Sequence, residues 1–107
     1  MNLILVGTNH NYSPVEFRER IYFSKKSSRD SLDFLKERGI LKGVVILSTC
    51  NRVEIYASSD DEELAIEEIK NFLAGQHKIN IDKFSSYLYI YKGIDAVTLT
   101  PLGVKFV

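Results

Sequence analysis

Two strand-like segments and the short polar turn between them make up the sequence Gly43-Val44-Val45-Ile46-Leu47-Ser48-Thr49-Cys50-Asn51-Arg52-Val53-Glu54-Ile55-Tyr56-Ala57. The first segment is continuously apolar and rich in β-branched residues, which is typical of a buried strand. The second alternates apolar and polar side chains with a period of two, which indicates a strand with one face toward the core. Because so few residues separate the segments, we expect an antiparallel hairpin with Cys50 in its turn.

The sequence before this hairpin predicts one strand and two helices. Residues 2–7 form a short, almost wholly apolar run that ends in glycine, which fits a buried strand. Ser13 precedes a proline and Glu16 follows three residues later, so this pair predicts a capping box for a helix over residues 14–21. A second helix is expected over residues 25–38.

The sequence after the hairpin predicts one helix and one strand. Asp60 and Glu63 have the spacing of an acidic capping box. An apolar stripe at helical spacing follows, ending before Gly75: Leu64, Ala65, Ile69, Phe72 and Leu73. Residues 76–86 are expected to be a polar connection. In residues 87–91 tyrosines alternate with aliphatic residues, which predicts a strand with a solvent-exposed tyrosine face rather than a platform for stacking bases.

The order strand, helices, strand, strand, helix, strand is that of a split βαβ arrangement. We therefore predict an α+β fold, a ferredoxin-like split βαβ sandwich with a mostly antiparallel sheet and its helices on one face. At 107 residues the chain is expected to be one domain with a modest core that needs no disulfide. A further helix is expected to begin within residues 93–96, with Asp95 suitable as its cap, and to be interrupted soon afterwards by Pro101 and Gly103.

Composition limits the classes of function. The 14 basic and 14 acidic residues cancel, so the chain lacks the positive charge expected of a stand-alone nucleic-acid binder. The best candidate for a basic patch that could bind nucleic acid has acidic residues among its neighbours, which favours a solvated helix face. Its members are Arg18, Arg20, Lys25, Lys26 and Arg29. Neither a signal peptide nor a membrane span is recognisable at the start of the chain, which predicts a cytoplasmic, reducing compartment.

The potential metal ligands are few. One cysteine together with His10 and His77 does not supply a zinc site at plausible spacing, so no metal is expected. His77 lies in the polar connection and is expected to be solvated.

Cys50 is the residue best suited to covalent chemistry. A thiolate attacks carbonyl groups far better than a hydroxyl does, and a neighbouring cation such as Arg52 favours the thiolate. Most lone cysteines, however, are small packing residues in the core. Thr49, Asn51 and Arg52 place hydrogen-bonding side chains around this one, and a turn between strands exposes its tip. The residues by themselves leave both interpretations open.

Two blocks of the sequence carry a family resemblance. The first is Gly7-Thr8-Asn9-His10, followed by Pro14-Val15-Glu16 and Arg18-Glu19. The second is longer and more specific, with the cysteine near its centre: Leu47-Ser48-Thr49-Cys50-Asn51-Arg52-Val53-Glu54-Ile55-Tyr56. Together they resemble the N-terminal catalytic domain of the glutamyl-tRNA reductase family, and the likeness covers residues 1–97. Residues 98–107 are expected to be a divergent tail.

The resemblance implies a thioester mechanism at Cys50. This residue would attack the ester that joins glutamate to its tRNA, release the tRNA and hold the glutamate as a thioester. NADPH would then reduce the thioester to glutamate-1-semialdehyde in tetrapyrrole (porphyrin and heme) biosynthesis. Thr49, Asn51 and Arg52 resemble the family's substrate-binding residues. Arg52 could anchor a substrate carboxylate or activate the thiol, and we favour the anchor. His10 is a candidate for shaping the active-site loop, although a structural histidine is the commoner case.

The sequence also departs from the family pattern. Asn11-Tyr12-Ser13 stands where the family has a basic residue followed by small ones, and Leu99 stands in place of an activity-supporting histidine. The glycines never form Gly-x-Gly-x-x-Gly, so we expect the NADPH-binding and dimerisation domains of the family to be absent and no cofactor to bind this chain. Because the family forms homodimers, an apolar surface left uncovered is expected to favour self-association.

Three hypotheses follow for the function. The first is the catalytic domain of an NADPH-dependent oxidoreductase, glutamyl-tRNA reductase, limited in this chain to thioester formation or ester hydrolysis. The second is a non-catalytic module from the same domain that binds an aminoacyl group or tRNA, or regulates the pathway. The third is an interaction fragment whose cysteine is buried. The accessibility and reactivity of Cys50 distinguish them.

Overall fold

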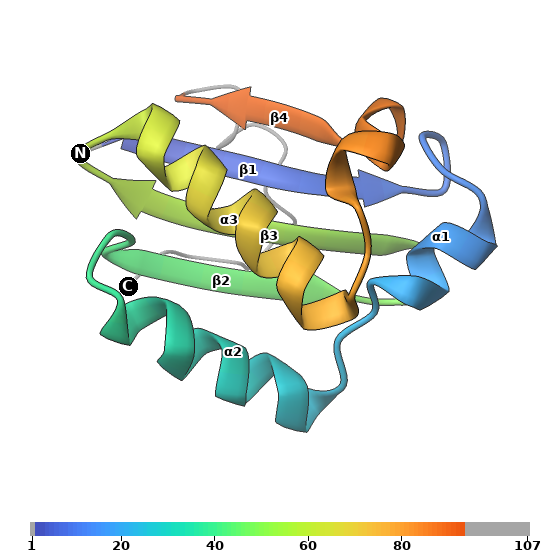
Figure 1. Ribbon diagram of the computed structural model, residues 1–107, viewed down its shortest axis with the longest axis horizontal. Coiled ribbons are helices and arrows are strands. Elements are labelled where there is room, and N and C mark those ends of the chain that lie inside the picture. Colours follow the sequence, from blue (N-terminus) through green and yellow to red (C-terminus); the bar gives the residue numbers. More distant parts are fainter. Residues whose placement is uncertain (1, 94–107) are drawn as a thin grey trace.

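The computed structural model describes residues 2–93, which form a four-stranded sheet with helices against one face (Figure 1). Its elements in chain order are β1 Asn2–Asn9, α1 Val15–Arg20, α2 Lys25–Glu37, β2 Gly43–Ser48, β3 Arg52–Ser59, α3 Glu62–His77, the 3-10 helix η1 Ile81–Tyr87 and β4 Tyr89–Lys92. The predicted α+β class is confirmed, as is the antiparallel sheet. The helix expected to begin within residues 93–96 lies almost wholly outside the described residues, and Leu99 lies outside them.

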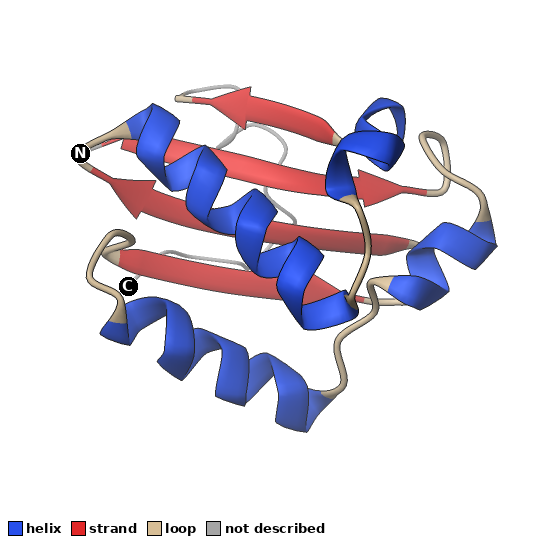
Figure 2. Ribbon diagram, viewed as in Figure 1, coloured by secondary structure: helices blue, strands red, loops and turns tan. Residues whose placement is uncertain are grey.

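The strands lie in the order β2-β3-β1-β4, and each neighbouring pair is antiparallel (Figure 2). β2 and β3 form the predicted hairpin, in which Ser48 pairs with Val53 next to the turn. Because β1 and β2 both run antiparallel to β3, they are parallel to each other with β3 between them. Asn9 at the end of β1 pairs with Arg52 at the start of β3. The β1–α1 connection and the cysteine turn therefore lie at the same end of the sheet.

The main core lies between the sheet and the helices. Alternate residues of β3 face it, namely Val53, Ile55 and Ala57, as their period of two predicts. The helices contribute large apolar side chains to the same core: Phe17, Leu35, Ile66, Ile69, Phe72 and Leu73. Burial of a large apolar side chain contributes about 1.5–3 kcal/mol. This shared core therefore holds the helices on one face of the sheet.

The opposite face of the sheet carries a second, smaller cluster. Leu5, Tyr56 and Tyr89 are buried in it. Glu54, which precedes Tyr56 by two residues on the same face of β3, is only 2% exposed. β3 is thus buried on both faces, whereas its alternating pattern predicted burial of one face only. A carboxylate in such a place needs hydrogen-bond donors around it.

The two predicted capping boxes are wrong in detail. Pro14 rather than Ser13 precedes α1, and no side chain caps this helix. The Ser13 hydroxyl instead accepts a hydrogen bond from Thr8 Oγ1 at 2.8 Å, in a buried position. Asp61 rather than Asp60 caps α3. The serine that was predicted to cap the helix is thus hydrogen-bonded to β1 instead.

The segment predicted to be a polar connection is regular and partly buried. α3 continues past Gly75 to His77, and the residue that caps it, Lys78, has a φ of 54° in the left-handed region. Ile79 is then buried in the main core. In η1, Phe84 packs against Phe17 of α1 with ring centroids 5.1 Å apart. This segment therefore closes one end of the core.

The predicted solvent-exposed tyrosine face is also wrong. β4 begins at Tyr89, so Tyr87 lies in η1 and packs against Phe17 with ring centroids 5.2 Å apart. Tyr89 is 8% exposed, and its ring lies 5.3 Å from that of Tyr91. Alternation along one segment cannot show that another part of the chain covers its polar face.

His77 is partly buried rather than solvated. Its ring meets Phe23 edge-on, with centroids 4.7 Å apart. Its Nε2 atom is buried and has no hydrogen-bond partner within the described residues. Removal from water disfavours the charged imidazolium, so burial lowers the pKa of His77 below its ordinary value of 6.5.

Replacement of His77 by glutamine is expected to reduce the loss of stability in acid. In the wild type the unfolded chain takes up a proton on His77 at a higher pH than the folded chain does. The free energy of unfolding therefore falls as the pH drops below about 6.5. Urea denaturation at about pH 7.5 and about pH 5.5 measures this fall. It should be smaller in His77→Gln, with His10→Gln as the control for removing a histidine. An equal fall in wild type and His77→Gln would contradict the burial of this imidazole.

Candidate functional site

Residues 49–51 form the turn between β2 and β3 and present Cys50 to solvent. The backbone N–H of Thr49 donates to the carbonyl oxygen of Arg52 at 2.7 Å, which closes the turn. Thr49 Oγ1 accepts hydrogen bonds from the backbone N–H groups of Asn51 at 3.2 Å and Arg52 at 3.1 Å. These bonds fix the local backbone. Cys50 is an exposed, free thiol, so the prediction of an exposed turn is confirmed and the hypothesis of a buried cysteine is wrong.

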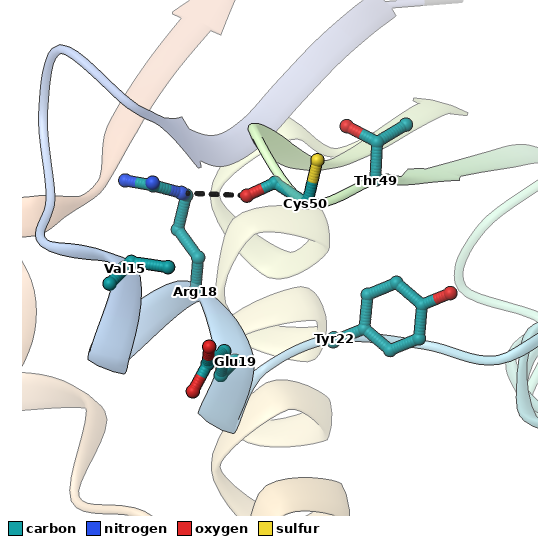
Figure 3. A pocket seen from close by; sticks show the side chains of 6 residues that line it. All are labelled: Val15, Arg18, Glu19, Tyr22, Thr49 and Cys50. Atoms are coloured by element: carbon teal, nitrogen blue, oxygen red, sulfur yellow. Dashed lines mark hydrogen bonds between the residues drawn. The ribbon is translucent and has the colours of Figure 1, made fainter.

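Arg18 of α1 is hydrogen-bonded to the backbone of this turn. Its Nε atom donates to the carbonyl oxygen of Cys50 at 3.1 Å (Figure 3), and its Nη1 atom donates to the carbonyl oxygen of Ser13. The Arg18 side chain is buried, with 9% of the residue exposed. The interpretation of Arg18 as part of a solvated basic face is therefore wrong. Its place in the first block of the family pattern was the signal in the sequence that set it apart.

A cavity of about 390 Å³ lies beside Cys50 (Figure 3). It is lined by Val15, Arg18, Glu19, Tyr22, Thr49 and Cys50. The hairpin turn supplies one side, and α1 with the segment after it supplies the other. The cavity thus depends on the contact between α1 and the turn, two segments that are far apart in sequence.

Arg52 lines a different cavity, of about 140 Å³. The other lining residues come from β1, β3, β4 and the loop after β1: Asn9, Tyr12, Glu54, Tyr89 and Tyr91. Within residues 2–93, the two cavities share no lining residue. The structure therefore places the candidate nucleophile Cys50 and the candidate anchor Arg52 at two neighbouring cavities around one turn.

The buried carboxylate of Glu54 organises the second cavity. Glu54 Oε1 accepts a hydrogen bond from the Tyr56 hydroxyl at 2.9 Å and pairs with Arg52 Nε at 3.2 Å. Glu54 Oε2 accepts from the Tyr89 hydroxyl at 2.5 Å. Asn9 Nδ2 in turn donates to the Tyr89 hydroxyl at 3.4 Å. Since Glu54 contacts the guanidinium of Arg52 through Nε, the two Nη groups are not used by this pair.

Burial and the Glu54 carboxylate hold the two tyrosines of this network in their neutral form. Burial raises the pKa of Tyr89 and of Tyr56 well above the ordinary range, and the bonds to Glu54 raise both further. Both hydroxyls therefore stay protonated and act as donors at neutral pH. Sequence reasoning missed Glu54, although its spacing of two from Arg52 placed both on one face of a strand.

The remaining predicted residues are peripheral to these contacts. The Asn51 side chain is exposed at the turn. His10 is exposed in the loop after β1, on the same end of the sheet as the turn. Among residues 2–93 no group of three or more histidine, cysteine, aspartate or glutamate side chains could hold a metal ion. In the same part of the chain, no helix combines the length and apolar character required to cross a membrane.

Comparison with known proteins points to one family. A family model described as the N-terminal domain of glutamyl-tRNAGlu reductase matches residues 6–100. A curated glutamyl-tRNA reductase from Thermodesulfovibrio yellowstonii is 47% identical over 104 residues, which cover 91% of this chain and 24% of the relative. A curated glutamyl-tRNA reductase from Desulfitobacterium hafniense is 42% identical over 94 residues, which cover 88% of this chain and 21% of the relative.

A solved structure agrees with these relatives. The chain is similar to glutamyl-tRNA reductase from Methanopyrus kandleri with a TM-score of 0.61 and 30% sequence identity. The likeness covers 89% of this chain and 20% of that one. The chain spans 21–24% of the length of the two curated relatives. The family model, the relatives and the fold agree. The chain therefore belongs to the glutamyl-tRNA reductase family and corresponds to its N-terminal domain.

Proposed function

We propose that this chain carries out the ester-cleaving step of the glutamyl-tRNA reductase reaction, with Cys50 as the nucleophile. The observation that carries the proposal is the exposed thiol of Cys50 on a turn that Thr49 closes and Arg18 holds, beside a cavity open to a substrate. A nucleophile held on such a rigid turn is available without a change of backbone conformation. Membership of the family supports glutamyl-tRNA as the substrate.

The proposed step exchanges one bond for another. The sulfur of Cys50 attacks the carbonyl carbon of the ester between glutamate and the terminal ribose of the tRNA. The carbon–sulfur bond forms, the carbon–oxygen ester bond breaks, and the ribose oxygen leaves and takes the thiol proton. The products are free tRNA and a glutamyl thioester on Cys50. Thr49 and Asn51 flank Cys50 in the sequence and are proposed to contact the acyl group.

Arg52 is proposed to anchor the carboxylate of the glutamyl group rather than to activate the thiol. Its Nε atom pairs with Glu54, and it lines the cavity that Cys50 does not. Two Nη groups on a planar guanidinium match a carboxylate in bidentate fashion. His10 keeps its proposed role in shaping the loop between β1 and α1.

The later steps are proposed for the full-length family enzyme. In that enzyme the hydride that reduces the thioester to glutamate-1-semialdehyde, in tetrapyrrole biosynthesis, would come from NADPH. The residues of this chain do not fit NADPH, because its glycines never form the dinucleotide fingerprint and Gly7, which follows the apolar run of β1, packs against Glu54. No reduction step is therefore assigned to this chain. A cytoplasmic location and self-association also stay proposals.

Two structural assignments belong to the same proposal. The sheet order, with β3 between the parallel strands β1 and β2, supports the ferredoxin-like split βαβ arrangement. The domain boundary proposed after residue 97, and the replacement of a histidine by Leu99, lie outside the described residues.

Incubation with tRNA carrying labelled glutamate tests the ester-cleaving step. The wild-type chain is expected to release free tRNA, and denaturing mass spectrometry should find the glutamyl group on the peptide that contains Cys50. Cys50→Ser, which keeps the size of the side chain, should neither trap the label nor speed release. Equal release by both proteins would contradict the proposal. Binding of glutamyl-tRNA without release would instead favour the non-catalytic binding or regulatory module.

A further inference from the structure

We infer that the cavity beside Cys50 binds the 3′-terminal nucleoside of the aminoacyl-tRNA, and that the ring of Tyr22 stacks on its base. The inference rests on the proposed function, in which Cys50 attacks the ester at the end of the tRNA. It adds where the leaving half of the substrate lies and which side chain binds it.

The positions of the two cavities divide the substrate. The carbonyl carbon of the ester must lie at the sulfur of Cys50, with the glutamyl group on one side and the terminal nucleoside on the other. Arg52, the proposed carboxylate anchor, lines the cavity of about 140 Å³. The cavity of about 390 Å³ is then left for the nucleoside, which is the bulkier half. Size and position thus lead to the same assignment.

The lining of the larger cavity suits a neutral, flat group. Val15 is 45% exposed and Tyr22 is 49% exposed, so both offer apolar surface to a ligand. Figure 3 shows the Tyr22 ring and the Glu19 carboxylate below the turn that carries Cys50. Nucleobases stack on exposed aromatic rings of this kind. The carboxylate of Glu19 can accept hydrogen bonds from a base amino group or a ribose hydroxyl.

The charges of the same cavity disfavour an anion. Among the described residues that line it, the one cation is Arg18, whose Nε and Nη1 atoms already donate to the carbonyl oxygens of Cys50 and Ser13. Glu19 adds a negative charge to the lining. A phosphate or carboxylate would therefore meet a guanidinium with two of its three nitrogens already engaged, beside a repelling carboxylate, whereas an uncharged nucleoside is not repelled by Glu19.

Basic side chains suited to the phosphates that precede the terminal nucleoside follow Tyr22 closely in the sequence. α2 begins a few residues after Tyr22, and its first turns carry Lys25, Lys26 and Arg29, all exposed. Lysine and arginine side chains contact phosphate oxygens without regard to sequence. An RNA strand whose phosphates contact these residues would place its last base at Tyr22. The ester on its terminal ribose would then lie at Cys50.

Equilibrium binding of two short RNA hairpins tests the inference without any chemistry at Cys50. One hairpin carries a complete tRNA acceptor end, and the other lacks only the 3′-terminal nucleotide. All proteins carry Cys50→Ser, so a failure of thioester formation does not affect the result. The chain with Tyr22 is expected to bind the complete hairpin about tenfold more tightly than the shortened one.

Substitutions at Tyr22 then decide whether its ring supplies this preference. Tyr22→Ala should bind both hairpins alike, and Tyr22→Phe, which keeps the ring, should retain the preference. Phe34→Ala is the matched control, because Phe34 of α2 is also 49% exposed but lines neither cavity of the site. Equal binding of both hairpins by the Tyr22 protein, or a preference that survives Tyr22→Ala, would overturn the inference. Trapping of glutamate on Cys50 of the wild-type chain, in the separate experiment with labelled glutamyl-tRNA, would leave the proposed function standing after either result.

Discussion

Replacement of Glu54 by alanine is expected to lower the free energy of unfolding by about 2–5 kcal/mol. The carboxylate is 2% exposed and accepts hydrogen bonds from the hydroxyls of Tyr56 and Tyr89. Without it both donors lose their charged acceptor, and a void opens where the side chain had packed. The pair with Arg52 adds little to this figure, because the Arg52 side chain is 38% exposed.

Urea denaturation of three proteins measures the effect of Glu54. Glu63→Ala is the matched control, because the Glu63 side chain is 81% exposed and pairs only at the surface with Lys92. Its loss should stay below about 1 kcal/mol. Glu54→Gln should fall between the two, since the amide keeps the shape but not the charge. A loss in Glu54→Ala no larger than that in Glu63→Ala would show that the carboxylate does not organise this face of the sheet.

Replacement of Gly7 by alanine is expected to lower the free energy of unfolding by about 1–3 kcal/mol. Gly7 in β1 lies opposite Glu54 in β3. A Cβ atom on Gly7 would lie 2.6 Å from the carbonyl oxygen of Val53 and 2.8 Å from Cα of Glu54. Both are backbone atoms of the adjacent strand, so the strands must move apart. The same movement would displace the Glu54 carboxylate from the tyrosine hydroxyls.

The same substitution at Gly75 provides a control with the opposite sign. Gly75 lies within α3, and a Cβ atom there would meet nothing within 4 Å. Gly75→Ala should raise the free energy of unfolding by up to about 1 kcal/mol, because alanine has the higher helix propensity. Equal effects of the two substitutions in thermal or urea unfolding would contradict the close approach of β1 and β3 at Gly7.

Local patterns predicted those elements whose cause is itself local. The apolar run before the turn and the alternation after it predicted the hairpin, because both periods belong to adjacent residues. The capping-box predictions were wrong because a cap also depends on contacts outside the local pattern. Ser13 has the right spacing for a cap, yet Thr8 of the neighbouring strand bonds its hydroxyl. The sequence cannot show which of two local partners the folded chain selects.

Some features of the cysteine motif were likewise predictable from the sequence, and others depend on the tertiary structure. Its residues predicted an exposed thiol in a turn, because Thr49 and its neighbours form that turn through bonds within a few residues. The sequence patterns around Arg18 and Glu54 did not predict that these residues belong to the site. Arg18 reaches Cys50 across 32 positions in the sequence, and Tyr89 reaches Glu54 across 35. Such contacts exist only once β1 pairs with both β3 and β4, so the fold, and not local spacing, sets the two cavities and the charges that face them.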